Sequence, residues 1–292
     1  MTQADGKLLA GIEAGGTKFV LAVGTAPDAI TARHVIPTRK PAETLAEAAE
    51  WFAEQGAIGA LGIASFGPLV IDRRSPAWGR IGRTPKPGWE NCDLAGYFAR
   101  WLAVPIGLDT DANGAALAEY SLGAGRGTSG MAYITVGTGI GGGLVINGDV
   151  VRGAGHPEMG HYHPRRNAND RGFAGHCPYH GDCLEGLASG PAILARWGSD
   201  LSQLPPGHEA HNLVSGYIAQ LCHTLFACTA TERIVLGGGV MKASGLVASV
   251  AAKVRMLDCD YLPGSQLQSV VSPELGEASG ITGALLLASR VS

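Results

Sequence analysis

The stretch LLAGIEAGGTKFVLAV, residues 8–23, has the pattern of two buried strands joined by a glycine turn. An acid, Glu13, closes the first strand, and two glycines at 15–16 form the turn. Glycines let backbone N–H groups point at a phosphate without a Cβ in the way. The hydroxyl of Thr17 can add a donor, and the ammonium of Lys18 can offset phosphate charge. The stretch therefore predicts a phosphate-binding turn at the end of a strand.

The same pattern returns in the middle of the chain. Met131 to Val136 predicts a strand, residues 137–143 (GTGIGGG) a glycine turn, and Leu144 to Ile146 a returning strand. A third glycine run, residues 237–239, follows a short strand predicted over Ile234 to Leu236. One such turn alone is as often a simple hairpin, but three at strand ends favour nucleotide binding. The residues expected to contact a nucleotide are Gly15, Gly16, Thr17, Lys18, Gly137, Thr138, Gly139, Gly237, Gly238 and Gly239.

Segments with the periodicity of helices lie between the predicted strands. Apolar residues recur at helical spacing over 43–54 and 94–101, and Ala112 to Tyr120 is rich in alanine. Further helices are predicted over residues 188–197, 213–231 and 280–289. Strands that alternate with helices predict an α/β architecture, and the repeated strand–turn–strand pattern predicts two similar halves facing a common cleft. The segment 67–93 is rich in Pro, Gly and Arg and predicts a long functional loop.

The composition argues against several classes of protein. The net charge is −3 with no basic tract, which makes nucleic acid and anionic membranes poor candidate partners. No apolar run is as long as a membrane span, and the polar residues 1–7 carry no signal-peptide core. There is no GxxxxGK[ST] loop, so a P-loop protein is excluded. The six cysteines, two of them close to several histidines, predict reduced thiols with a metal site in a cytoplasmic protein.

A candidate catalytic carboxylate lies where a predicted short strand, residues 105–108, gives way to a helix. The sequence there is Asp109-Thr110-Asp111-Ala112-Asn113. Ligands of open α/β sheets bind outside the carboxyl ends of strands, where a carboxylate can accept a proton from a sugar hydroxyl. Asp111 is the better candidate for this base because it begins the helix. The alternative is that Asp111 only caps the helix.

Histidines and cysteines crowd a short stretch after the second glycine turn. The loop CPYHGDC, residues 177–183, offers three zinc ligands, and a fourth can come from His161, His163 or His176. Four protein ligands make a closed structural site, whereas three with a water make a catalytic zinc, as in a zinc-dependent hydrolase. Scattered surface histidines and buried cysteines are the remaining alternative. Glu158 and Glu185 lie near this stretch and are able to hydrogen-bond sugar hydroxyls.

Taken together, these motifs resemble the ROK sugar kinases, a branch of the actin-like ATPase superfamily, and most closely their bacterial fructokinases. Residues 11–18 and 136–143 resemble the two phosphate motifs of that family, with Glu13 where most members have Asp. Residues 111–119 resemble its catalytic segment, which implies that Asp111 is the base. Thr110 stands where the family usually has Asn.

The resemblance also implies a sugar site and a zinc site. Residues 158–161 are similar to the family's ExGH element, and Cys183-Leu184-Glu185 is similar to the end of its cysteine motif. The implied sugar contacts are Asp111, Glu158, His161 and Glu185. The CxxHxxC loop is similar to the fructokinase branch, and the implied zinc ligands are His161, Cys177, His180 and Cys183. Thr84-Pro85-Lys86-Pro87-Gly88-Trp89 also looks like that branch.

The fold implied is the two-domain actin-like ATPase (ribonuclease H-like) fold, with the active site in the cleft between domains. We expect one domain at residues 1–111 plus 280–292, and a second, with the zinc loop, at 112–279. ATP, Mg²⁺ and Zn²⁺ are the implied cofactors, and phosphorylation of D-fructose to fructose 6-phosphate by a homodimer is the implied activity. Glucose, mannose or an N-acetylated amino sugar are alternative substrates. A non-catalytic sugar-sensing regulator is a further alternative, but such relatives carry a helix-turn-helix segment for which a first strand at Leu8 leaves no room.

Overall fold

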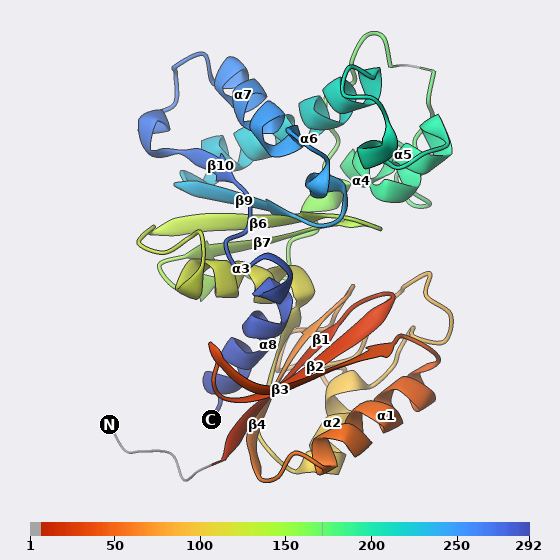
Figure 1. Ribbon diagram of the computed structural model, residues 1–292, viewed down its shortest axis with the longest axis vertical. Helices are drawn as coiled ribbons and strands as arrows, with labels where there is room; N and C mark the ends of the chain where they lie inside the picture. The colour runs from red at the N-terminus through yellow and green to blue at the C-terminus, as the bar shows by residue number, and fades with distance from the viewer. Residues whose placement is uncertain (1–6, 171) are drawn as a thin grey trace. The chain divides into compact units, whose positions relative to one another are not determined.

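The computed structural model describes residues 7–170 and 172–292, which form two compact units (Figure 1). Unit 1 takes the chain up to Ala118 together with Val151–His156 and Glu277–Ser292. Unit 2 takes Glu119–Val150 and Pro157–Gly276. The signal-peptide argument above rests mainly on residues 1–6, which lie outside the described part of the chain. The return of the segment 151–156 to unit 1 has no signal in the sequence.

Unit 1 is built on a five-stranded sheet in the order β3-β2-β1-β4-β5. The first three strands are antiparallel neighbours, and β1, β4 and β5 run parallel. The carboxyl ends of these three parallel strands therefore meet at one edge of the sheet. The strands are β1 (Leu8–Ala14), β2 (Lys18–Ala26), β3 (Ala29–Pro37), β4 (Ile58–Ser65) and β5 (Ile106–Thr110).

Unit 2 repeats this topology. Its five-stranded sheet has the order β10-β9-β6-β7-β8, in which β6, β7 and β8 are antiparallel and β6, β9 and β10 are parallel. Taken in chain order, both sheets follow the arrangement 3-2-1-4-5, which confirms the two similar halves predicted from the sequence. The strands are β6 (Gly130–Val136), β7 (Ile140–Ile146), β8 (Asp149–Val150), β9 (Arg233–Gly237) and β10 (Ser269–Val271).

Helices cover both faces of the unit 1 sheet (Figure 1). The helices α1 (Pro41–Ala53) and α2 (Leu94–Leu102) supply the apolar core on one face, and α8 (Ser279–Ser289) packs on the other. The predicted cap of α2 is confirmed, since Asp93 Oδ1 accepts from the N–H of Gly96 at 3.1 Å. This arrangement follows from the alternation of each strand, which presents successive side chains to opposite faces.

A row of glycines lets α8 lie directly on the sheet. Gly11, Gly62 and Gly107 are in register on β1, β4 and β5. A Cβ on Gly62 would lie 1.7 Å from the carbonyl oxygen of Ala284, and one on Gly107 would lie 2.1 Å from that of Leu287. Any side chain at these two positions would push the helix away. The close approach explains part of the high glycine content.

The helices predicted within unit 2 are found close to their expected positions, and one short helix precedes them. The helix expected over 188–197 is α5, which begins at Gly190 because the backbone is extended at Ser189, and a separate short helix, α4, ends just before it. The remaining long helices are α6 and α7. The bounds are α3 (Asp111–Leu122, which begins in unit 1 and ends in unit 2), α4 (Leu184–Ala188), α5 (Gly190–Trp197), α6 (Glu209–Thr229) and α7 (Leu246–Asp258).

The second glycine turn is shorter than predicted. Strand β7 begins at Ile140, so the glycines at 141–143 belong to the strand and only residues 137–139 form the turn. Gly142 is in a strand for a packing reason, because a Cβ there would lie 2.4 Å from the sulfur of Met159. Strands β3, β8 and β10 and helix α7 have no counterpart in the prediction. For β3 the reason is that the strand is largely exposed and lacks an apolar pattern.

Two further expectations concern the cysteines and membranes. All six cysteines are free thiols, which confirms that there is no disulfide framework. Across residues 7–170 and 172–292, no helix combines the length and the apolar character that a membrane span requires.

Candidate functional site

Two carboxylates lie at the carboxyl edge of the unit 1 sheet. Glu13, Ala64 and Asp109 form the next register row after the glycine row, on the same face of the three parallel strands. The Glu13 carboxyl lies against the start of α8, since a Cβ on Gly280 would come within 2.4 Å of it. Burial, and then the charge of Asp111, raise the pKa of Glu13 to about 7. Glu13 and Asp111 are therefore close enough to interact.

The first glycine turn has its carbonyls paired and its amides available. Gly15 N–H donates to the carbonyl of Lys18 at 2.9 Å, and Thr38 Oγ1 donates to the carbonyl of Gly15 at 2.8 Å. The Thr38 N–H donates to the carbonyl of Thr17 at 2.9 Å. Among the described residues, the N–H groups of Gly16 and Thr17 have no hydrogen-bond acceptor, and the space beyond Gly16 is open. Unpaired amides beside open space are suited to an anion.

The buried carboxylate of Asp109 organises the segment before Asp111. Its Oδ1 accepts from the N–H of Thr110 at 2.8 Å and from Nδ2 of Asn113 at 2.6 Å. Its Oδ2 accepts from Nε of Arg152 at 2.9 Å and also from Nη2 of the same guanidinium. A buried charge needs such pairing, because desolvation without it is costly. The paired guanidinium comes from the segment 151–156.

Thr110, not Asp111, performs the capping of α3. Its Oγ1 accepts from the N–H of Asn113 at 3.1 Å, three residues along, in the manner of an N-cap. Asp111 Oδ1 accepts a short-range bond from the N–H of Ala112 at 2.8 Å. The bond to the N–H of Asn113, three residues after Thr110, thus comes from Thr110. The same contact gives a structural role to the threonine that stands where the family has Asn.

Unit 2 brings its two glycine turns together. The carbonyl of Gly137 accepts from the N–H of Gly190, at the start of α5, at 2.8 Å. A Cβ on Gly137 would lie 3.9 Å from the nitrogen of Gly239, and Gly238 has φ +94°, which favours glycine. In the described part of the chain, no hydrogen bond is formed by the N–H of Thr138. The arrangement is a second surface of backbone N–H groups at strand ends.

Glu185 lies against the second turn. Its Oε2 accepts from the N–H of Ile140 at 2.9 Å and would lie 2.8 Å from a Cβ on Gly139. Glu158 precedes the 3₁₀ turn Met159–His161, which packs so closely that a Cβ on Gly160 would come within 1.9 Å of the carbonyl oxygen of Ile140. Glu185 and the turn that links Glu158 to His161 thus both lie against Ile140.

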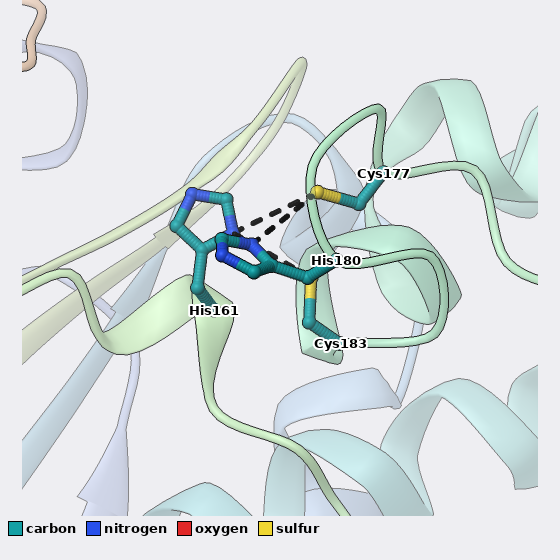
Figure 2. Close-up of side chains that lie close together, drawn as sticks. All are labelled: His161, Cys177, His180 and Cys183. Atoms are coloured by element: carbon teal, nitrogen blue, oxygen red, sulfur yellow. Dashed lines mark hydrogen bonds between the residues drawn. The ribbon is translucent and has the colours of Figure 1, made fainter.

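Four predicted metal ligands converge in unit 2 (Figure 2). Their ligand atoms all lie within 4.8 Å of one another. His161 Nδ1 is 3.2 Å from His180 Nδ1, 3.8 Å from Cys177 Sγ and 3.5 Å from Cys183 Sγ. Bonds of about 2.0–2.3 Å to a tetrahedral zinc place ligands about 3.3–3.8 Å apart, so the geometry fits this ion. We call these four residues the His/Cys cluster.

Local backbone contacts explain how the cluster forms. Cys177 and Gly181 exchange backbone hydrogen bonds of 3.2 and 3.0 Å, which close the loop into a tight turn. The N–H of Leu184 donates to the carbonyl of Tyr162 at 2.8 Å and brings the end of this loop to the segment that carries His161. His163 lies outside the cluster, with Nδ1 3.7 Å from an oxygen of Asp182.

Burial favours the protonated thiol of Cys183 when no metal ion is bound. It raises the pKa of Cys183 to about 11. Coordination to a zinc ion would remove this proton, since a coordinated thiol is bound as the thiolate. Four protein ligands leave no open coordination position, which is the arrangement of a structural site.

Some residues near the site were not predicted from the sequence. Arg152 follows a two-residue strand and has no motif around it. His156 stands among the histidines of the crowded stretch, but it belongs to unit 1 and its Nε2 accepts from the N–H of Leu69 at 3.0 Å. Lys86 contacts the carbonyl of Gly16 through its ammonium. Its segment, residues 84–89, was recognised as a motif, but the contact itself has no signal in the sequence.

Comparison with known proteins agrees with this geometry. The chain is 45% identical to a fructokinase from Zymomonas mobilis, over 97% of each chain. It is 38% identical to a fructokinase from Pediococcus pentosaceus, over 96% of this chain and 97% of that one. The solved ROK hexokinase from Thermus thermophilus matches with a TM-score of 0.79 at 30% identity, over 97% of this chain and 98% of that one.

The fold similarity confirms the predicted actin-like ATPase fold, with mixed α/β structure in two sheets. The family model described as the ROK family matches residues 9–291, nearly the whole described chain. The two phosphate motifs and the catalytic segment quoted from the sequence lie within this range. On these grounds the chain belongs to the ROK family.

Proposed function

We propose that the protein is an ATP-dependent fructokinase that transfers the γ-phosphate of ATP to the primary hydroxyl of D-fructose. Both relatives described above carry the name fructokinase and are matched over nearly their full length. The observation that carries the proposal is in unit 1. A carboxylate, Asp111, follows a parallel strand and interacts with Glu13, two residues before a turn with unpaired amides.

Unit 1 would supply the base and part of the phosphate site. Asp111 would accept the proton of the sugar hydroxyl as its oxygen attacks the γ-phosphorus. The N–H groups of Gly16 and Thr17 would bind phosphate oxygens. Glu13 would hold Mg²⁺ through water, and this ion would neutralise phosphate charge. The raised pKa of Glu13 suits this role, because a nearby cation restores the ionised form.

Unit 2 would supply the remaining nucleotide contacts and the sugar contacts. Thr138 and the backbone of residues 237–239 would bind the nucleotide. Glu158, His161 and Glu185 would accept or donate hydrogen bonds to sugar hydroxyls. The position of Glu185 against the second turn supports a link between sugar and nucleotide binding, because the carboxylate that would contact sugar also orders Ile140.

The His/Cys cluster would hold a structural zinc. The donor set of two thiolates and two imidazoles, with its tetrahedral spacing, supports zinc over harder cations. The ion would stabilise the loop that connects His161 to Glu185. A zinc-dependent hydrolase needs an open position for water, and the four converging protein ligands argue against that alternative.

We also propose a domain division, a homodimer and a cytoplasmic location. The domain division, at residues 1–111 plus 280–292 and 112–279, comes from the sequence pattern. The homodimer comes from the family resemblance, and the cytoplasmic location comes from the composition.

An ADP-release assay across a panel of hexoses tests the proposed function. The purified protein with MgATP is expected to turn over fructose with the highest kcat/KM. Glucose, mannose and N-acetylmannosamine serve as comparison substrates, and a preference for any of them would replace fructose in the proposal. Absence of sugar-dependent ADP release with every hexose would overturn the kinase assignment and leave the sugar-sensing alternative.

A further inference from the structure

The segment TPKPGW, residues 84–89, has no part in the mechanism proposed above, yet it reaches the first glycine turn. The Lys86 ammonium donates to the carbonyl of Gly16, which lies 70 residues earlier in the chain. Together with the bonds described above, this contact completes the pairing of every carbonyl from Gly15 to Lys18. The contact therefore places a cation directly at the turn whose amides are unpaired.

A buried tryptophan fixes the position of this lysine. Trp89 is fully buried, and its Nε1 donates to the carbonyl of Arg39 at 2.9 Å. Its ring centroid lies 5.4 Å from those of both Phe19 and Phe66. The N–H of Trp89 donates to the carbonyl of Lys86 at 3.2 Å, so the core residue and the lysine belong to one turn. Lys86 is thus presented by an anchored backbone, although the residue is only half-buried.

The chemistry of the ammonium group suits a phosphate at this turn. An ammonium has three N–H donors, and the carbonyl of Gly16 uses one of them. The other two donors are available to an anion bound beside the turn. Charge neutralisation and positioning are most of what a protein contributes to phosphoryl transfer.

We propose that Lys86 is a further catalytic residue, whose ammonium binds the phosphoryl group during transfer. This inference rests on the proposed kinase function. The bond between the γ-phosphorus and the ADP oxygen breaks, a bond to the sugar oxygen forms, and the hydroxyl proton passes to Asp111. Lys86 stays protonated throughout and stabilises the charge that develops on the phosphoryl oxygens.

Lys18, the other lysine of the turn, has a different neighbourhood. Its charge lowers the pKa of Glu13 and opposes the effect of burial. Lys18 thus interacts with the carboxylate at the end of β1, whereas Lys86 contacts the backbone of the turn itself. Lys40 is exposed and lies on the same unit, and its side chain has no part in this arrangement. It offers a matched control for the loss of one positive charge.

The test compares K86M, K86R and K40M in the full-length protein. We expect K86M to lower kcat about 100-fold, K86R to retain about a tenth of kcat, and K40M to be unchanged. By calorimetry, K86M is expected to bind ADP within about 2-fold of wild type and to bind the non-hydrolysable analogue AMPPNP about 10-fold more weakly. The melting temperature separates these effects from misfolding.

Two results would overturn the inference. Wild-type kcat in K86M would show that the lysine does not act on the reaction. An equal loss of ADP and AMPPNP affinity, with a lower melting temperature, would show that Lys86 only shapes the turn. Failure of the proposed function is a separate outcome, because it appears as the absence of sugar-dependent ADP release in the wild-type protein itself.

Discussion

The guanidinium of Arg152 pairs with the buried carboxylate of Asp109, two residues before Asp111. Arg152 is on the short segment 151–156, which joins unit 1 after the β7–β8 hairpin of unit 2. The carboxylate it neutralises also holds the side chain of Asn113 in the first turn of α3. The position of the proposed base thus depends on a cation that is remote in sequence.

Replacing Arg152 with Met should lower both stability and turnover. The Asp109 carboxylate would remain buried without its cation, and we expect a loss of about 1–3 kcal/mol in the free energy of unfolding, because the arginine is half-exposed. Urea denaturation measures this loss. R126M, which breaks the exposed pair with Glu274, is the control and should change stability by less than about 0.5 kcal/mol. Equal effects of the two variants would contradict the role given to Arg152.

Replacing Asp111 with Asn should remove turnover and leave sugar binding measurable. An amide has a similar size but cannot accept the proton, and loss of a general base lowers rates by about 10²–10⁴-fold. Calorimetry with fructose and the ADP-release assay measure the two properties separately. D28N, which changes an exposed carboxylate on the same unit, should behave as wild type. Phosphorylation by D111N at the wild-type rate would exclude Asp111 from the mechanism.

Replacing His180 with Ala should lower the zinc content and weaken sugar affinity. Loss of one of the four ligands opens the site and loosens the loop between His161 and Glu185. Metal analysis and calorimetry with fructose provide the measurements, and a strong chelator should reproduce the effect in the wild-type protein. H163A is the matched control, because His163 lies outside the cluster. Undiminished sugar affinity in the metal-free protein would refute the stabilising role.

Glu13 should make stability depend on pH. Its pKa of about 7 in the folded protein exceeds the ordinary 4.5, so the folded state binds more protons than the unfolded state between these values. Stability should therefore fall as pH rises from about 4.5 to about 7, by about 2–3 kcal/mol from this group. E13Q should lack this contribution. Denaturation at several pH values, without nucleotide or divalent cation, tests it, and parallel profiles for both proteins would count against it.

The glycine row predicts a contrast between two substitutions of the same kind. Gly62→Ala would place a methyl group 1.7 Å from a carbonyl of α8 and should destabilise by about 3 kcal/mol. Gly216→Ala has nothing within 4 Å on helix α6 and should stabilise by about 0.5–1 kcal/mol. Thermal denaturation of both variants measures the difference. A tolerated G62A would mean that the helix does not need the close approach.

Local signals predicted much of the fold, because they come from neighbouring residues. The β1–β2 hairpin and the cap of α2 at Asp93 are encoded within a few positions. Long-range pairing was not readable, since no local pattern shows that Arg152 meets Asp109 or that Lys86 meets Gly16. The start of β7 was misplaced for the same reason, because its glycines are needed for packing against a segment that is distant in the sequence.

The candidate site shows the same division. The four zinc ligands implied by the family resemblance are the four residues that converge in the structure. The spacing of histidines and cysteines alone had left three histidines as candidates for the fourth ligand. The threonine at position 110 could be understood only from structure, because its capping bond depends on where the helix begins. The sequence identified which residues belong to the site, and the structure showed which contacts each of them makes.

The glycine row on the unit 1 sheet also affects how the protein folds during its synthesis. The strands that carry Gly11, Gly62 and Gly107 leave the ribosome before α8, and all of unit 2 lies between them and α8 in the chain. Until α8 emerges, the glycine row on that face has neither side chains nor a helix to exclude water. Unit 2 ends at Gly276, before α8 begins. Unit 2 can therefore finish folding while the sheet of unit 1 still lacks the helix that covers one of its faces.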